Sequence, residues 1–382
     1  MKERSLSHWP VFMMLTLSAR LSAHVIVLPA VLDVSARDAW LCGLLAFAIV
    51  IPWLAVFLYG SVKRTNGIHI RAWLRTRATP FGAWLIVLPV MLELLLTSYQ
   101  AYIETAVWTS TTFLPITPEI VVLIVLMALN VAAAYCGLRA IAYMSCLLLP
   151  VVVVLGDFVM SANMPHKDYS VLLPMLEHGW GGALHGTIYA ASSLMEIFLF
   201  LFLQHYMKNR IRLWELVLFC VFIAVLMIGP TIGAITQFGP VEAEKLRYPA
   251  FSQWRLVSIG KYFEHVDFFA IFQWASGSFI RVTLGLVLIM ELVPIRGKKG
   301  RLWFLAIAGA VYIVVSRLLA SVMIQAELVM RAIFVVDLAI AFGVTAAIWL
   351  LSFKGVPKGG MLDDRTPQPA GAGEGSGTAN NL

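Results

Sequence analysis

Long uncharged apolar runs recur along the whole chain, and they restrict its fold more than any other feature. Four of them cover residues 39–60, 120–138, 140–156 and 216–241. A helix that crosses a bilayer needs ~20 mostly apolar residues. Only 13% of the 382 residues are charged, whereas soluble domains carry about 25%. The sequence therefore predicts an all-α integral membrane protein.

The hydropathy pattern predicts ten transmembrane helices. Their expected bounds are 9–31, 39–60, 81–111, 117–137, 140–161, 183–206, 213–237, 266–292, 302–323 and 331–353. Lys and Arg gather in the loops on the same side as the N-terminus, which the positive-inside rule places in the cytoplasm together with the C-terminus. The first apolar run contains Arg20 and His24 and lacks a cleavage site, so we expect no cleavable signal.

One transmembrane domain is expected over residues 1–355, followed by a disordered cytoplasmic tail at 356–382 that is rich in Gly, Pro and Ala. The domain divides into halves 9–161 and 183–353, with five spans each. Because five is odd, the halves insert in opposite orientations. In each half the longest connector follows the second span. This layout predicts a 5+5 inverted repeat, although the two halves share no convincing residue identity.

Several function classes find no support in the sequence. There is no phosphate-binding loop, no HExxH and no Gly-x-Ser-x-Gly elbow, so we do not expect an enzyme. The four cysteines lie in or beside apolar runs and form no disulfide or metal pattern. The net charge of +7 is spread over short loops, which argues against a nucleic-acid partner. We expect no cofactor and no metal.

The third span carries a polar stripe. Glu93, Thr97, Gln100 and Glu104 follow one another at helical spacing and share one face, and Tyr99 lies nearby. A charge at mid-membrane costs ~2.5–3.5 kcal/mol on insertion scales, so this face should not meet lipid. Two interpretations stay open: the wall of a cavity that binds a zwitterionic or polar small molecule, or a buried network that holds helices together.

Small and hydroxylated residues interrupt the first and sixth spans at their midpoints, over 18–24 and 190–196. They predict discontinuous helices, because such residues help to satisfy freed backbone groups. A half-helix end exposes N–H groups that suit a carboxylate. The candidate ligand-binding residues in these two stretches are Ser18, Arg20, Ser22, Ser192, Ser193 and Glu196.

Arg20 and Glu196 both lie near mid-membrane, on helices that should be adjacent. We predict that they form an ion pair. The alternative is that Arg20 binds the carboxylate of a ligand directly.

The eighth span adds Gln273, Trp274 and Ser278 as ligand candidates. Arg281 on the same helix is expected to snorkel or to pair with an acid. Asp337 and Arg317 are candidates for a pair within the second half.

Two features near the membrane surface have simpler expectations. His185 and His205 lie at the two ends of the sixth span and are expected to be hydrogen-bonded interfacial histidines. The loop 61–80 holds five basic residues among apolar ones. It is predicted to be a surface helix on anionic lipid headgroups, with a docking face for a partner subunit as the alternative.

The stretch YPAFSQWRLVSIGKYFEHVDFFAIFQW, residues 248–274, resembles the outer segment and following helix of the B subunit of GerA-type spore germinant receptors. The residues that carry the resemblance are Tyr248, Pro249, Phe251, Arg255, Ile259, Gly260, Glu264 and Asp267. Leu28-Pro29 and the stretches 113–118 and 163–180 add weaker support. Arg20 departs from that family, which usually has small residues in the first span.

The resemblance implies a transporter-like fold of the amino acid–polyamine–organocation superfamily. It also implies a nutrient-sensing subunit for spore germination, in the inner membrane of the spore. Its partners would be a small-molecule germinant such as an amino acid, an A subunit, a lipoprotein C subunit and the lipid bilayer. By analogy, residues 245–265 would form an outer lid over the central site. A membrane-surface helix with aromatic anchors is the alternative.

Two functions remain open on physical grounds. One is a sensor whose ligand biases a conformational equilibrium that partner subunits read. The other is a secondary active amino acid or cation transporter. Both need a central pocket in a bundle that changes shape, and the resemblance favours the sensor.

Overall fold

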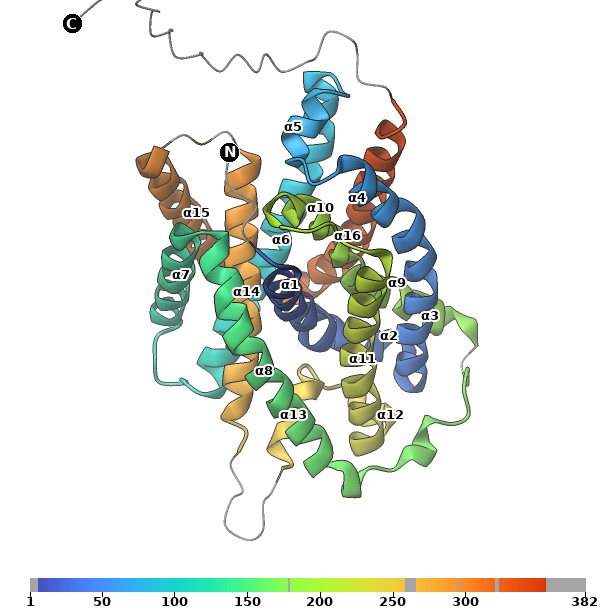
Figure 1. Cartoon of the computed structure of the whole chain (residues 1–382). Helices are drawn as coiled ribbons and strands as arrows, with labels where there is room; N and C mark the ends of the chain where they lie inside the picture. Colours follow the sequence, from blue (N-terminus) through green and yellow to red (C-terminus); the bar gives the residue numbers. More distant parts are fainter. Residues whose placement is uncertain are drawn as a thin grey trace, which may run out of the picture.

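The computed structural model describes residues 6–177, 179–257, 266–293, 295, 297–319 and 323–354. These residues form a bundle of helices, and no β-strand occurs among them (Figure 1). The long helices are α1 (His8–Leu21), α2 (Val27–Ser35), α3 (Ala39–Trp53), α6 (Pro80–Thr112), α7 (Glu119–Cys136), α8 (Leu138–Ala162), α9 (Trp180–Met195), α11 (Leu213–Phe238), α14 (Phe269–Leu292), α15 (Gly297–Leu319) and α16 (Met323–Leu351). The shorter ones are α4 (Tyr59–Thr65), α5 (Ile70–Arg75), α10 (Phe200–Leu203), α12 (Pro240–Ala243) and α13 (Pro249–Arg255).

Nine helical stretches in the described part of the chain are long and apolar enough to cross a membrane. The first of them, His8–Thr65, has 58 residues and would be about 87 Å long if straight, against a hydrocarbon thickness of about 30 Å. It reverses after Ser35, where Ala36 has a φ of 42°. This stretch therefore holds two of the ten predicted spans, 9–31 and 39–60.

Contacts between distant loops define one end of the bundle. The N–H of Leu6 donates to the Tyr206 carbonyl at 3.1 Å, and the Arg64 guanidinium donates to the Ser352 hydroxyl at 3.0 Å. Two residues at the same end of the bundle must be separated by an even number of membrane-spanning helices. With ten spans, Leu6 and Tyr206 are separated by six, and Arg64 and Ser352 by eight. We call this end, which includes α4, α5 and the segments 76–79, 207–212 and 352–354, the basic end. Helices α12 and α13 lie at the opposite end (Figure 1).

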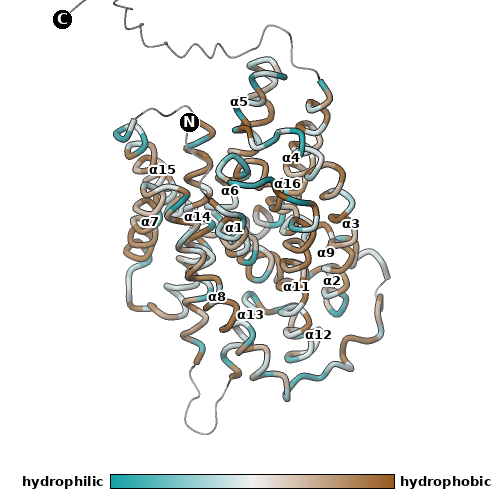
Figure 2. The backbone as a smooth tube through the Cα atoms, viewed as in Figure 1, coloured by the Kyte–Doolittle hydropathy of each residue, from teal (hydrophilic) through white to brown (hydrophobic). Residues whose placement is uncertain are grey.

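The outer surface is apolar where lipid would lie. Ile124, Leu147, Val154, Val225 and Leu318 are all at least half exposed. Figure 2 shows hydrophobic colour along α3, α7 and α8, and hydrophilic colour at the start of α15. A surface of this kind is stable in hydrocarbon and not in water, so the chain is a multi-pass membrane protein.

Close helix packing puts α9 and α14 at the centre of the bundle. A Cβ added to Gly186 of α9 would lie 2.2 Å from Ser35 Oγ and 2.7 Å from Cys42 Sγ. One added to Gly285 of α14 would lie 2.8 Å from the Ser98 Cβ on α6. Glycine at these two positions allows the backbones to approach closely, as small residues do in membrane bundles.

The first and sixth spans differ from the predicted interrupted helices. Between α1 and α2 the chain forms a π-helical turn, η1 (Ser22–Ile26), and after α9 it forms a 3₁₀ turn, η6 (Glu196–Leu199). Neither stretch is unwound, so neither exposes a half-helix end as predicted. Both stretches lack Gly and Pro, and a change of helical type keeps most backbone groups bonded where an open break would not.

Helix α13 packs into the end of the bundle. Phe251, Gln253 and Trp254 are buried, and the Asn163 side-chain amide donates to the Gln253 carbonyl at 2.9 Å. This burial contradicts the surface-helix alternative for residues 249–254. Residues 258–265 of the expected lid, the tail 356–382, and Ile259, Gly260 and Glu264 of the quoted motif lie outside the described residues.

Candidate functional site

A buried ion pair joins α14 to η6 at the centre of the bundle. Arg281 Nη1 lies 2.6 Å from Glu196 Oε2, and Arg281 Nη2 lies 2.7 Å from Glu196 Oε1. The two side chains are 5% and 7% exposed. The parallel geometry is the strong, bidentate form of an arginine–carboxylate contact. The predicted Arg20–Glu196 pair is therefore wrong, because Arg281 occupies both carboxylate oxygens.

Two more helices are tied to the same guanidinium. Arg281 Nη1 donates to the Ser18 carbonyl of α1 at 3.1 Å, and Nε donates to the Thr97 carbonyl of α6 at 3.4 Å. The Ser22 N–H at the start of the π-helical turn bonds to the Ala19 carbonyl. That carbonyl replaces the usual i−4 acceptor, Ser18. The change of helical type thus leaves the Ser18 carbonyl for Arg281.

A small cavity of about 10 Å³ lies beside this pair. Its polar lining comes from Ser18, Glu93, Thr97, Glu196 and Arg281. The first four were predicted from the sequence to bind ligand, and they come from the first, third and sixth spans. A cavity of this volume holds about one water molecule. In this conformation the inner part of the polar stripe is thus a packed network around a small void.

Carboxylates outnumber cations around the cavity. Glu93 is 2% exposed, and its Oε2 has no hydrogen-bond partner among the described residues. Asp337 of α16 is 8% exposed, and its Oδ1 also lacks one. Both side chains interact electrostatically with Glu196 and Arg281. With every group ionised, the four would carry three negative charges and one positive charge.

Such an excess of buried negative charge is costly in a low-dielectric interior. The arrangement can therefore take up a cation or protons. The expected pairing of Asp337 with Arg317 is wrong, because Arg317 is exposed while Asp337 is buried near the Arg281–Glu196 pair.

Glu104, at the outer end of the polar stripe, binds the segment that precedes α13. Glu104 accepts hydrogen bonds from Arg247 Nη2 at 3.1 Å and from the Tyr248 hydroxyl at 3.0 Å. Burial, together with the Glu104 carboxylate, raises the pKa of Tyr248, so this hydroxyl stays protonated and donates. Gln100 is buried between the two parts of the stripe. Glu104 thus anchors the segment before α13 and does not line the cavity.

The three ligand candidates on the eighth span, Gln273, Trp274 and Ser278, contact neighbouring helices. Gln273 accepts from Trp254 Nε1 at 3.0 Å and donates to the Val152 carbonyl at 2.8 Å. The Trp274 ring stacks on the Trp108 ring with centroids 4.2 Å apart. Ser278 Oγ donates to the Ala101 carbonyl at 3.1 Å. These three residues hold α14 against α6, α8 and α13.

The remaining ligand candidates are three serines and Tyr99, and they lie outside the lining of the cavity. Ser192 Oγ donates to the Tyr189 carbonyl at 2.8 Å, and Ser193 Oγ donates to the Ala190 carbonyl at 2.9 Å. Ser22 is buried in the π-helical turn. The Tyr99 ring contacts the Tyr312 ring of α15, with centroids 5.5 Å apart. None of these four residues lines the cavity.

Arg20 is a buried cation in a separate place. It is 4% exposed and does not line the cavity. Its guanidinium forms no ion pair and no hydrogen bond with the described residues. His24, one turn further on, has Nδ1 at 3.4 Å from the Leu226 carbonyl of α11. Arg20 is therefore a positive charge that the described protein leaves without a partner.

Comparisons with known proteins agree with this architecture. A family profile described as "Spore germination protein" matches residues 6–323. Spore germination protein XB of Bacillus anthracis is 39% identical over 279 residues, which cover 73% of this chain and 78% of that protein. A mutant form of a manganese transporter of Eremococcus coleocola superposes with a TM-score of 0.50 at 15% identity. The superposition covers 91% of this chain and 78% of the transporter.

The structural likeness at this identity concerns the fold alone, which is that of a transporter. The sequence match covers most of the chain and includes the four helices that surround the central cavity. From these matches and the membrane-spanning bundle it follows that this chain belongs to the spore germination protein family and has a role related to germination permeases.

Proposed function

We propose that this chain is a nutrient-sensing subunit of a spore germinant receptor that binds a small polar ligand, in the first place an amino acid, at the centre of its bundle. In this proposal it lies in the inner membrane of the spore, with the basic end and both termini in the cytoplasm. An A subunit and a lipoprotein C subunit complete the receptor. Membership of the germination family supports this assignment.

The observation that carries the ligand proposal is the Glu93 carboxylate. Its Oε2 is buried, lacks a hydrogen-bond partner in the described part of the chain and belongs to a side chain that lines the cavity. The cation that lines the same cavity, Arg281, already binds Glu196 in a bidentate fashion. The ammonium group of an amino acid is a compact cation with three donors. It would offset the excess charge of Glu93 and Asp337.

Ligand binding at Glu93 requires the bundle to change shape. The cavity of about 10 Å³ is far too small for an amino acid. The ligand would therefore bind a conformation in which α1, α6, η6 and α14 have moved apart. A ligand that binds one of two conformations more tightly shifts the population toward it. This displacement is the signal that we propose the partner subunits read.

Arg20 is our candidate for the ligand carboxylate in the expanded state. It is a buried guanidinium without a partner in the described chain, and a carboxylate is its natural complement. Helix α13 would act as a lid, because its burial over the end of the bundle closes the path opposite the basic end.

The expected 5+5 inverted repeat remains part of the proposal. The first helix of each half changes helical type near its middle, at η1 and η6, and each contributes a group to the central network, the Ser18 carbonyl and Glu196. A short helix follows the second span of each half, α5 at the basic end and α13 at the opposite end (Figure 1). Both features fit two halves inserted in opposite orientations.

The test uses spores of the host with the chromosomal copy replaced by variants. Glu93→Gln keeps the size of the side chain and removes its charge. It should abolish the germination response to the amino acid that triggers wild-type spores, while the protein level in spore membranes stays normal. Glu242→Gln, on an exposed side chain of α12, is the matched control and should respond as wild type. A normal dose response of Glu93→Gln would contradict the proposed site.

A second measurement separates sensing from transport. Vesicles that contain the purified chain should bind the labelled amino acid without accumulating it against a gradient. Ion-driven accumulation that Glu93→Gln abolishes would contradict the sensor and assign a secondary transporter.

A further inference from the structure

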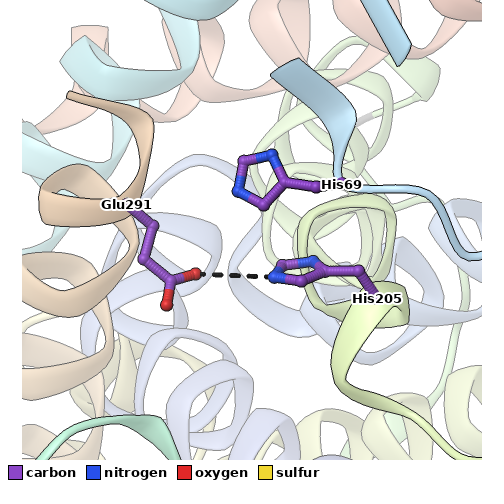
Figure 3. Close-up of side chains that lie close together, drawn as sticks. All are labelled: His69, His205 and Glu291. Carbon is purple, nitrogen blue, oxygen red and sulfur yellow. Dashed lines mark ion pairs between the residues drawn. The ribbon is translucent and has the colours of Figure 1, made fainter. Parts of the chain in front are cut away.

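Three side chains with metal-binding atoms converge at the basic end, away from the central cavity. They are His69 before α5, His205 in the 3₁₀ turn η7 (Gln204–Tyr206) and Glu291 near the end of α14. One nitrogen from each histidine and one carboxylate oxygen all lie within 4.8 Å of one another. Figure 3 shows the two imidazoles beside each other and the carboxylate facing His205.

Tyr206 holds the carboxylate by a hydrogen bond and packs its ring on the ring of His205, with centroids 4.1 Å apart. The Tyr206 hydroxyl donates to Glu291 Oε1. The other carboxylate oxygen, Oε2, lies 3.8 Å from His205 Nε2. The two side chains are 12% and 13% exposed, so both are largely removed from water. The Tyr206 contact orients Glu291, as supporting hydrogen bonds orient the ligands of known metal sites.

His69 is positioned by helix α5, which follows it, and by hydrogen bonds between the segment before it and Gln204 of η7. Its Nδ1 accepts the Arg71 N–H at 3.3 Å, so the ring proton lies on Nε2, which is turned toward Glu291 (Figure 3). A metal ion on Nε2 would move this proton to Nδ1 and replace the Arg71 bond, because a neutral imidazole has only one nitrogen with a free lone pair. Ile70, Trp73 and Leu74 of α5 are at most 1% exposed, which anchors the helix. Gln204 donates to Thr65 Oγ1 at 2.7 Å and accepts the Gly67 N–H at 3.2 Å. These bonds fasten the segment before His69 to the residue before His205.

We propose that His69, His205 and Glu291 bind one divalent transition-metal ion, with Zn²⁺ as the best match. Two imidazoles and a carboxylate are a ligand set that suits zinc and neighbouring first-row ions, and it leaves a further position for water. Ligand atoms lie about 2.0–2.1 Å from Zn²⁺, and hence about 3.4 Å from one another in a tetrahedron. The ligand atoms are now up to 4.8 Å apart. Side-chain rotations that move each of them by about 1 Å would bring them to the spacing of a tetrahedral site.

The site would join the two halves of the chain. His69 lies in the first half, and His205 and Glu291 lie in the second. A metal ion on all three would fasten the segment before α5 to η7 and to the end of α14, and so restrict relative movement of these elements at the basic end. An adjacent cleft of about 660 Å³, lined in part by Asn66, Gly67 and Gln204, gives solvent a route toward this region. The metal proposal does not depend on the ligand proposed for the central site.

The test is zinc titration of the full chain in lipid nanodiscs, with the affinity tag removed. Calorimetry should give one Zn²⁺ per chain. His69→Asn keeps a group that can cap α5, and His205→Gln and Glu291→Gln keep the size and polarity of the side chains. Each should weaken Zn²⁺ binding at least tenfold. The control His185→Gln, on an exposed histidine at the other end of the same span, should bind as wild type.

Two further readouts show which atoms bind the ion and whether it fastens the halves. Co²⁺ in place of Zn²⁺ should give a visible absorption band, which His205→Gln loses. Zn²⁺ should also raise the unfolding temperature of the wild type and of His185→Gln, because an ion that binds only the folded state stabilises it. This shift should be absent in His205→Gln and Glu291→Gln.

If one of these variants does not yield folded protein, Tyr206→Phe replaces it. Loss of the hydroxyl that orients Glu291 should weaken Zn²⁺ binding 10–100-fold, as supporting groups do in known sites. Equal Zn²⁺ affinity in the wild type and all three ligand variants would overturn the proposal. So would the absence of Zn²⁺ binding by the wild type, and the cluster would then be a hydrogen-bonded network that joins the two halves.

Discussion

At the residue scale, the two buried arginines have opposite environments. Arg281 makes two hydrogen bonds to Glu196 and further bonds to the Ser18 and Thr97 carbonyls. Arg20 has no partner in the described chain. Removal of one member of a buried ion pair strongly destabilises the folded protein, because the other charge is left buried and unpaired. Removal of a buried charge that has no partner instead relieves a desolvation penalty. Substitution of the two arginines should therefore have opposite consequences for stability.

Arg281→Met should reduce the free energy of unfolding by about 3–5 kcal/mol, because it leaves the Glu196 carboxylate buried and unpaired. The double variant Arg281→Met with Glu196→Leu should recover most of this loss, since it replaces the pair with apolar groups. Reversible unfolding in mixed micelles measures both. A double variant less stable than either single variant would contradict this account of the pair.

Arg20→Met should leave the free energy of unfolding unchanged or raise it, because no partner is lost with the charge. The same variant should lose the germination response if Arg20 binds the ligand carboxylate. Unfolding and spore assays on one set of variants measure the two effects. A strongly destabilised Arg20→Met would mean that the guanidinium has a structural role, and a normal response would remove it from the site.

The sequence predicted which polar residues face inward better than it predicted their partners. Ser18, Glu93, Thr97 and Glu196 do line one cavity, because helical spacing and the cost of exposure to lipid fix the buried face of a helix. Arg281 was expected either to snorkel or to pair with an acid, and Glu196 was assigned to Arg20. Pairing depends on how helices rotate against one another, and no spacing within a single helix records that rotation.

At the element scale, α9 packs against the end of α2 through Gly182 and Gly186. A Cβ added to Gly182 would lie 2.4 Å from the Val34 carbonyl oxygen. Gly186→Ala should lower the free energy of unfolding by about 1–3 kcal/mol, the usual cost of overpacking, because its Cβ would lie 2.2 Å from Ser35 Oγ. Gly181→Ala is a matched control on the same helix, where an added Cβ meets nothing within 4 Å. Similar stability of the two variants would contradict this packing.

The tether between Glu104 and the segment before α13 gives a second prediction for an element. Glu104→Gln removes the charge that Arg247 and Tyr248 bind. Amide hydrogen exchange at residues 249–257 should become faster, because local opening costs less when a tether is lost. Exchange in α14 should not change, and Glu242→Gln should match the wild type. Unaltered exchange at 249–257 would show that α13 is held by its buried side chains alone.

The helices themselves were predictable because the bilayer fixes their length and composition. The ten expected spans correspond to helices in the structure, with two of them joined in the stretch His8–Thr65. The sequence located the irregular stretches of the first and sixth spans but did not predict their helical type. Small residues at 18–24 and 190–196 marked the correct stretches, but a chain without Gly or Pro there adopts π and 3₁₀ turns instead of an open break. The cluster of His69, His205 and Glu291 was missed, because its members lie on three segments far apart in the sequence.

At the scale of the whole molecule, the structure presents a conformation in which the central site is too small for a ligand and is covered by α13 at the end opposite the basic end. Helix α13 fills the end opposite the basic end, and the helices around Arg281 leave about 10 Å³ beside Glu93. Ligand binding at Glu93 requires a second conformation in which these helices separate. The elements available for this movement are α1 and the segment from α9 to α10, since both change helical type next to the cavity.

The most direct test of the central claim is a structure of the full chain in a lipid nanodisc, by electron cryo-microscopy, with the amino acid that triggers germination in the spore assay. We expect density for the ligand against Glu93, with its amino group toward the carboxylate and with α1 and α14 further apart than here. Ligand density elsewhere, with the Glu93 side chain still packed beside the Arg281–Glu196 pair, would contradict the proposed site.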